Sequence, residues 1–338
     1  MNLVRAELER LTARRFVQLM VVLLLVAFAV TAATTLAGSH RPTEVELRGA
    51  QEQAATEIRQ MEAAHDRCLR IKAGQETPTE TDYVPTDCAE IDPGRMDRLP
   101  IAANYLEGVF TFSVEARPLL YFLIAFLVLF GFLVGASYIG ADLNSGGVVN
   151  LLLWRPRRWA VLGAKLGTLL GALLALSAVA SAAYLAVFWL IGQTAGHPGY
   201  LDGAFWASLG AIYGRGLVLV LLAGAVGFAI ATLGRHTAAA LGTVAAYLVV
   251  WELGARLVLD ILDAARPDQW MLSSYLAAWL NGEVSFWDRH ACRGNYDYSS
   301  FCDGSYLLGW GSGLAVLLGL TVLLVGGAFT AFRRRDLI

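Results

Sequence analysis

Three charged residues within otherwise apolar stretches are the first candidates for chemistry. Arg215, Glu252 and Arg256 interrupt runs of the sequence that are almost entirely hydrophobic. A charge in such surroundings is costly unless another group neutralises it, so it marks either a strut between helices or a contact to substrate. We predict an ion pair between Arg215 and Glu252, shared with Arg256, on two antiparallel neighbouring helices. An internal strut is the simpler interpretation, and substrate contact is the alternative.

The cysteines form a second candidate group. The chain contains four, and none of them lies in an apolar run: Cys68, Cys88, Cys292 and Cys302. No Cys-x-x-Cys spacing is present, which makes a zinc site the weaker interpretation. Disulfides are the stronger one, and the sequence-local pairings are Cys68–Cys88 and Cys292–Cys302, although four cysteines allow three connectivities. We predict no metal site.

Motifs for enzymatic chemistry are missing from the sequence. There is no His-Glu-x-x-His helix, no Gly-x-Ser-x-Gly elbow and no G-x-x-x-x-G-K-[ST] phosphate loop. We therefore predict no catalytic residue and no cofactor in this chain. The net charge of −2 also argues against a nucleic-acid partner, because phosphate contacts need a basic surface.

The composition indicates a membrane protein. Hydrophobic residues make up 57% of the 338 positions and charged residues 16%, and the mean hydropathy is +0.54. A span needs about 20 apolar residues. Six runs meet that length: 16–37, 118–141, 160–192, 205–233, 238–262 and 306–332. We predict an all-α integral membrane protein with six transmembrane helices. The first run is longer than a signal-peptide core and has no clear cleavage site, so a retained anchor is favoured over a cleaved signal.

Basic residues orient these spans. Twelve Arg and Lys residues flank them on one face. Eleven lie in the segments 1–15, 142–159, 234–237 and 333–338, and the twelfth, Lys165, follows the second of these segments. The positive-inside rule places these segments, and both termini, in the cytoplasm. The segments 38–117, 193–204 and 263–305 are then external, which agrees with the positions of all four cysteines. The high Ala, Gly and Arg content suggests a bacterial source, and we predict that the spans lie in the bacterial plasma membrane.

Three segments outside the spans have patterns of their own. Residues 1–15 read as an amphipathic helix on the membrane surface, with Leu3, Leu8 and Leu11 facing lipid. The region 38–117 begins with a long helical pattern and returns through a Pro-containing stretch, as a disulfide-tied external cap. The segment WMLSSYLAAWL (270–280) is too short to span and predicts a re-entrant or interfacial helix.

The loop 142–159 is the most informative cytoplasmic segment. Asp142, or more plausibly Asn144 or Ser145, can cap a short helix that Pro156 ends. The apolar face of such a helix needs a protein partner. Its residues with a predicted docking role are Asp142, Val148, Leu152, Trp154, Arg155, Arg157 and Arg158. The simpler alternative is an ordinary basic loop on the cytoplasmic face.

Several short motifs occur in a familiar order. They are Asp142, Ser145-Gly146-Gly147, the helix 148–154, Pro156-Arg157-Arg158, Gly163-x-Lys165 and the ending AFRRRDLI. With the amphipathic N-terminal helix, six spans and a re-entrant segment before the sixth, the chain resembles the permease subunits of type-2 ABC exporters. It departs from them in having Asp142 where Glu is usual, and in a larger region between the first two spans.

This resemblance implies partners and a function. It implies that a separate ATPase subunit, present in two copies, binds ATP and Mg²⁺ and docks on the 148–154 helix with Arg155, Arg157 and Arg158. It also implies a second permease subunit, identical or related, lining one pathway for an amphiphilic substrate in the membrane. The alternative is a membrane scaffold or sensor whose external region binds a partner and which transports nothing.

Overall fold

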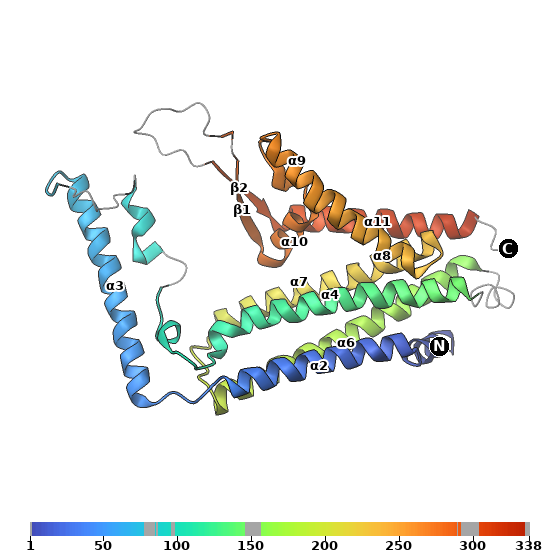
Figure 1. Ribbon diagram of the computed structural model, residues 1–338, viewed down its shortest axis with the longest axis horizontal. Helices are drawn as coiled ribbons and strands as arrows, with labels where there is room; N and C mark the ends of the chain where they lie inside the picture. Colours follow the sequence, from blue (N-terminus) through green and yellow to red (C-terminus); the bar gives the residue numbers. More distant parts are fainter. Residues whose placement is uncertain are drawn as a thin grey trace.

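A computed structural model of the chain describes residues 2–77, 85, 87–95, 99–145, 157–288, 290–291 and 304–334. Most of the described residues are helical, and five helices are long and apolar enough to cross a membrane. These are α2 (Arg15–Ala37), α4 (Phe112–Asn144), α6 (Arg158–Thr194), α7 (Gly203–Gly234) and α11 (Trp310–Arg334). Five of the six predicted spans therefore correspond to single helices. Figure 1 shows that the N-terminus and the end of α11 lie at the same end of the bundle.

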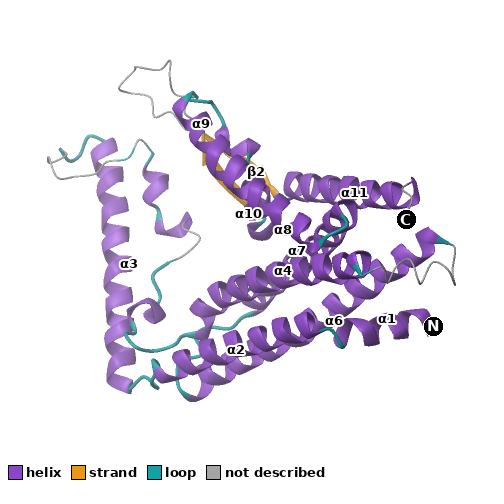
Figure 2. Ribbon diagram, turned by 45° about the vertical axis from the view of Figure 1, so that its right-hand side comes forward, coloured by secondary structure: helices purple, strands orange, loops and turns teal. Residues whose placement is uncertain are grey.

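The N-terminal helix α1 (Asn2–Thr12) docks against the bundle beside α6 (Figure 2). Its prediction as a helix is confirmed, but the predicted lipid-facing stripe is wrong in part. Leu8 is exposed, whereas Leu11 and Glu7 are buried at 3% and 1% exposure. Glu7 and Leu11 are four residues apart and share one face. That face turns toward the protein because the Glu7 carboxylate has buried polar partners there.

The helices α4 and α7 lie side by side along the centre of the bundle (Figure 1). Glycines let their backbones touch: a Cβ on Gly135 would collide with the carbonyl of Gly224, and one on Gly227 would collide with the carbonyl of Phe132. A Cβ on Gly131 would lie 2.9 Å from the Val220 carbonyl oxygen. Small residues at such contacts allow tight packing where lipid removes the hydrophobic drive for association.

A long helix, α3 (Glu44–Lys72), projects away from the bundle after α2 (Figure 1). Its start is fixed by a capping box, in which the Thr43 hydroxyl accepts from the Glu46 amide and the Glu46 carboxylate accepts from the Thr43 amide. The chain returns through three 3₁₀ turns, Cys88–Ile91, Pro93–Arg95 and Ala102–Tyr105.

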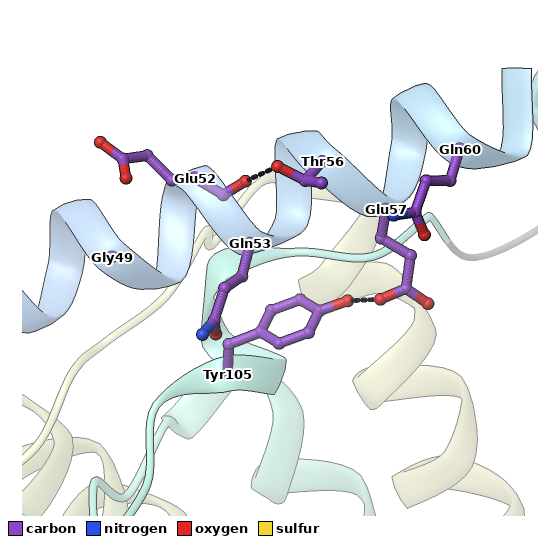
Figure 3. A pocket seen from close by; sticks show the side chains of 7 residues that line it. All are labelled: Gly49, Glu52, Gln53, Thr56, Glu57, Gln60 and Tyr105. Atoms are coloured by element: carbon purple, nitrogen blue, oxygen red, sulfur yellow. Dashed lines mark hydrogen bonds between the residues drawn. The ribbon is translucent and has the colours of Figure 1, made fainter. Parts of the chain in front are cut away.

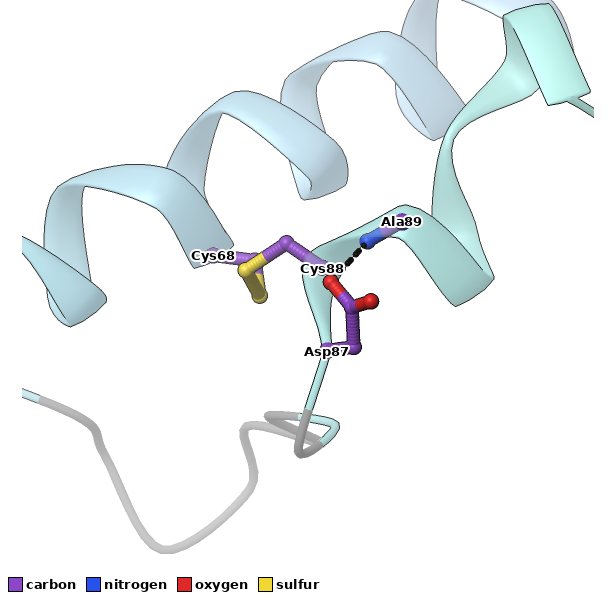
Figure 4. The surroundings of a disulfide bond; sticks show 4 residues. All are labelled: Cys68, Asp87, Cys88 and Ala89. Atoms are coloured by element: carbon purple, nitrogen blue, oxygen red, sulfur yellow. Dashed lines mark hydrogen bonds between the residues drawn. A yellow bond between two sulfur atoms is a disulfide. The ribbon is translucent and has the colours of Figure 1, made fainter.

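Two links hold this return segment against α3. The predicted Cys68–Cys88 disulfide is confirmed and joins the last turn but one of α3 to the first 3₁₀ turn (Figure 4). The hydroxyl of Tyr105 donates to the carboxylate of Glu57 at mid-helix (Figure 3). The helical region predicted for residues 38–117 therefore consists of the single long helix α3 and a return segment that packs along it.

The segment predicted as the fifth span, 238–262, consists of three consecutive helical pieces. These are α8 (Thr237–Ala246), a π-helix (Tyr247–Ala255) and α9 (Arg256–Ile261). π-helical widening is rare and is concentrated at functional sites. Many apolar side chains here point outward, and Val249, Leu253 and Leu257 are more than 60% exposed.

A short helix and a hairpin precede α11. After a 3₁₀ turn (Pro267–Trp270), α10 (Leu272–Asn281) confirms the short helix predicted within 270–280. The strands β1 (Glu283–Trp287) and β2 (Ser305–Gly309) then pair antiparallel, with Glu283 opposite Gly309. The all-α prediction is thus corrected, because residues 306–309 belong to a strand and the last span begins at Trp310. The residues Val284, Phe286, Trp287 and Tyr306 are of the β-branched and aromatic types that favour the extended conformation.

Candidate functional site

A buried ionic network lies at the end of the bundle where α4 ends and α6 begins. At its centre is Lys165 of α6, whose side chain is 2% exposed. Its ammonium nitrogen donates to Glu7 Oε2 and to Asp142 Oδ2, each at 2.7 Å. A cation between two carboxylates at this range satisfies groups that would otherwise be expensive to bury.

Tyr138 contacts both an anion and the cations of this network. Its hydroxyl donates to Glu7 Oε2 at 2.5 Å, and its ring lies beneath Lys165 and Arg14, with 4.9 and 5.1 Å from the cationic centres to the ring centroid. Both cations are within the range of a cation–π contact. The ring therefore supports the cations while the hydroxyl supports the anion.

Arg14 closes the network on the other side of Asp142. Its guanidinium donates to Asp142 Oδ1 and, at 3.1 Å, to the carbonyl of Ser137. Arg10 adds a longer contact of 3.3 Å to Glu7 Oε1. We call Glu7, Arg14, Tyr138, Asp142 and Lys165 the basal network. It ties together α1, the last turns of α4 and the second turn of α6.

The basal network brackets the predicted coupling loop. Asp142 lies just before residues 146–156, and α6 begins just after them. Four of the predicted docking residues, Val148, Leu152, Trp154 and Arg155, fall outside the described residues. Asp142 has a role that the sequence did not indicate, because it anchors Arg14 and Lys165 and is only 18% exposed.

The two remaining docking residues differ in environment. Arg157 precedes the first residue of α6 and is exposed. Arg158 donates to the carbonyl oxygens of Phe332 and Arg333 at 3.5 and 3.3 Å. A cation there suits the negative end of α11. Arg158 therefore joins α6 to α11, while Arg157 presents its charge to solvent.

The predicted Arg215–Glu252 ion pair is wrong. Glu252 instead accepts hydrogen bonds at the start of α10, from the Ser273 amide at 3.0 Å and the Ser273 hydroxyl at 2.8 Å. The Tyr247 hydroxyl donates to the same carboxylate at 2.8 Å and accepts from the Leu272 amide at 3.3 Å. These are the amides that a helix N-terminus leaves without an intrahelical partner.

Arg215 serves the opposite end of α10. Its guanidinium donates to the Leu280 carbonyl at 3.3 Å, and its own carbonyl accepts from the Trp279 indole at 2.9 Å. The negative charge of Glu252 and the positive charge of Arg215 thus match the dipole of α10. Arg256, which was expected to share the pair, forms a 3.2 Å salt bridge with Asp268.

Two other predictions about sites concern the second pair of cysteines and a metal ion. Cys292 and Cys302 lie outside the described residues, so their pairing stays a prediction. Among the residues that the structure describes, no group of three or more His, Cys, Asp or Glu side chains could hold a metal ion.

Sequence reasoning missed Glu7 and Tyr138. Glu7 sits on a helix whose leucines suggested a lipid-facing surface, and Tyr138 lies inside an apolar run. The one available signal was Lys165, a lysine close to the start of a span in a chain whose only other lysine is Lys72. A buried lysine needs an anion, and the nearest candidates in space come from distant segments.

Five apolar helices of spanning length are typical of a multi-pass helical membrane protein. The family match specifies this class. The model of the family described as "ABC-2 family transporter protein" matches residues 1–337 of the chain. The chain belongs to this family, as a membrane-embedded permease component of an ABC transporter. Neither the curated proteins nor the solved structures that were compared with the chain include a significant match.

Proposed function

We propose that the chain is the transmembrane permease subunit of an ATP-driven exporter in the bacterial plasma membrane. It forms the substrate pathway as a dimer with an identical or related subunit and couples to a separate ATPase, which binds ATP and Mg²⁺. The family membership and the apolar helices support the membrane role. The remaining parts of the proposal rest on the arguments below.

The proposal counts residues 237–261 as a sixth span. Three consecutive helical pieces fill this segment. At ~1.5 Å per residue they extend about 37 Å, which exceeds a hydrocarbon core of about 30 Å. Six spans return the chain to its starting side, and the basic flanks favour the cytoplasm for both termini.

The observation that carries the coupling proposal is the basal network. It fixes α1 and the end of α4 to the start of α6, on both sides of residues 146–156. Force applied to this loop by an ATPase would act on α4 and α6 together. The hydrogen bond from Arg158 to α11 would transmit the same force to that helix. A loop on an ordinary basic surface would need no such buried anchorage.

The test is ATP hydrolysis by the purified complex of the permease with its ATPase. Arg157→Glu reverses an exposed charge beside the loop, and we expect it to abolish stimulation of ATPase activity by the permease. Arg48→Glu makes the same change on exposed α3 and is the matched control, which we expect to retain stimulation. Retained stimulation in Arg157→Glu would contradict the docking role. Purification without an ATPase would favour the scaffold or sensor function.

Thiol labelling tests the orientation. In a chain with Cys292 and Cys302 replaced by Ser, we expect a membrane-impermeant maleimide to label Gln60→Cys on α3 in intact cells. Arg157→Cys should react only after the cells are permeabilised. The reverse pattern would overturn the assignment of sides.

A further inference from the structure

The far end of the bundle from the basal network contains a cavity of about 900 Å³ with a mixed polar and apolar lining. Its walls come from α4, α7, the end of α10 and the start of β1. A cavity of this size is within the range of small-molecule sites. Apolar side chains such as Val114, Pro118 and Ile212 line it together with Arg117 and Arg215.

Among the residues that the structure describes, the two arginines donate to neutral acceptors. Arg117 donates to the Ser208 hydroxyl at 2.9 Å and Arg215 to the Leu280 carbonyl, and both of these acceptors are neutral. Neither guanidinium takes part in an ion pair among the described residues. Each guanidinium has five N–H donors in a fork that matches an oxyanion. Glu283 is the one carboxylate in the lining, so the wall keeps an excess of positive charge.

The two arginines contact the cavity at different levels along α7, Arg117 from α4 and Arg215 from α7 itself. Arg117 is held at Ser208, and Arg215 lies two helical turns further along α7, about 10 Å deeper at ~1.5 Å per residue. Arg215 therefore sits within a membrane-crossing helix, where an unneutralised charge is costly. Because Arg215 lines the cavity, water or an anion bound there would reduce this cost.

The wall opposite α7 is fixed by a hydrogen bond between α4 and α10. The Tyr121 hydroxyl donates to the Asn281 side-chain oxygen at 2.7 Å, and the Asn281 amide nitrogen donates to the Ala277 carbonyl. Both side chains are thus committed to structure. One N–H of the Asn281 amide remains, so the charged donors left for a ligand are those of Arg117 and Arg215.

We propose that this cavity binds the anionic headgroup of an amphiphile, with Arg117 and Arg215 contacting its oxyanion and the apolar lining contacting its hydrocarbon part. The inference rests on the proposed function, since it names the class of molecule that the exporter releases on this side. Phosphate and carboxylate headgroups share the chemistry that the two guanidinium groups recognise.

The test measures binding by native mass spectrometry of the delipidated, detergent-solubilised permease, without its ATPase. The probes are dioleoylphosphatidylglycerol and its soluble headgroup analogue glycerol phosphate. We expect the lipid to bind, and glycerol phosphate to bind much more weakly because it lacks acyl chains. Arg117→Gln and Arg215→Gln should each weaken lipid binding by about tenfold or more, as for loss of a charge-assisted contact.

Two further variants separate recognition from structure. Arg48→Gln removes a cation on exposed α3, outside the lining of the cavity, so it should leave lipid affinity unchanged. Arg215→Lys keeps the cation beside α10 and should retain most of the binding that Arg215→Gln loses. Thermal unfolding of each variant identifies those that fail to fold, and Arg117→Gln tests the site without touching the α10 terminus.

Unchanged lipid affinity in both Gln variants would overturn the inference. Glycerol phosphate binding as tightly as the lipid would also overturn it, since the site would then take a free anion. Because this assay needs no ATP hydrolysis, its failure is distinct from that of the proposed function. If the permease stimulates ATPase activity but binds no lipid, the proposed exporter function stands and the proposed headgroup site is rejected.

Discussion

Lys165→Met tests the basal network most directly, because it removes the cation between two buried carboxylates. Each 2.7 Å contact from Lys165 carries an attraction of about 6 kcal/mol at an effective dielectric constant of ~20. The cost of burying these charges offsets most of that attraction. The measured loss on removing one partner of a buried pair is about 3–5 kcal/mol, and we expect this range.

The two carboxylates are affected unequally. Asp142 keeps Arg14, whereas Glu7 keeps only the Tyr138 hydroxyl and the contact to Arg10, whose side chain is 56% exposed. Adding Glu7→Gln to Lys165→Met removes the stranded charge. We therefore expect the double variant to regain part of the lost stability, with a coupling energy of about 0.5–3 kcal/mol.

The assay is unfolding by SDS in mixed micelles, which gives the free energy of unfolding for each variant. Arg5→Ala provides the control on the same helix, because the Arg5–Glu9 pair has a similar 3.1 Å distance but side chains 85% and 69% exposed. Such a pair contributes about 0.2–1 kcal/mol. A Lys165→Met loss no larger than the Arg5→Ala loss would refute the reasoning, as would a double variant with no recovery.

Three further predictions concern the other end of the molecule and α10. Cys88→Ser opens a bridge between cysteines separated by 20 positions, which should lower the stability of α3 and its return segment by about 3 kcal/mol on loop-entropy grounds. Limited proteolysis of this region should become faster, while stimulated ATPase activity stays unchanged. Glu252→Ala should raise hydrogen exchange at the Ser273 amide and cost about 0.5–2 kcal/mol as a lost helix cap, whereas Thr243→Ala on α8 should leave that amide unaffected. Hydrogen bonds from the Thr43 amide and hydroxyl lower the pKa of Glu46, so the capping box contributes stability above the ordinary glutamate pKa and loses it as the pH falls through the lowered one. The protection factors of the amides in the first turn of α3, which correct for the intrinsic pH dependence of exchange, should therefore fall on acidification in the native chain and stay constant over that range in Glu46→Gln.

The sequence predicted the apolar helices well because the thickness of the bilayer demands long uncharged runs. The bounds of α2, α6 and α7 differ from the predicted spans by one or two residues. The disulfide between Cys68 and Cys88 was also predictable, since its partners are close in the chain. Each of these features follows from local composition or spacing.

The features that were missed depend on contacts between distant segments. Lys165 meets Glu7 across 158 positions, so nothing near either residue in the chain indicates the pair. Arg215 and Glu252 had the right types for an ion pair, but the ends of α10 offered unpaired backbone groups closer to each of them. A pairing argument from charge alone omits the backbone as a competing partner.

The close contact of α4 with α7 has a mechanical consequence. The helix α4 holds Asp142 of the basal network near one end and Arg117 of the headgroup cavity near the other. The two residues are about 37 Å apart along the axis at ~1.5 Å per residue. Backbone contacts at Gly135 and Gly227 leave little room for bending between them. A tilt of about 5° at the loop end would therefore move the cavity wall by about 3 Å, comparable to the length of one hydrogen bond.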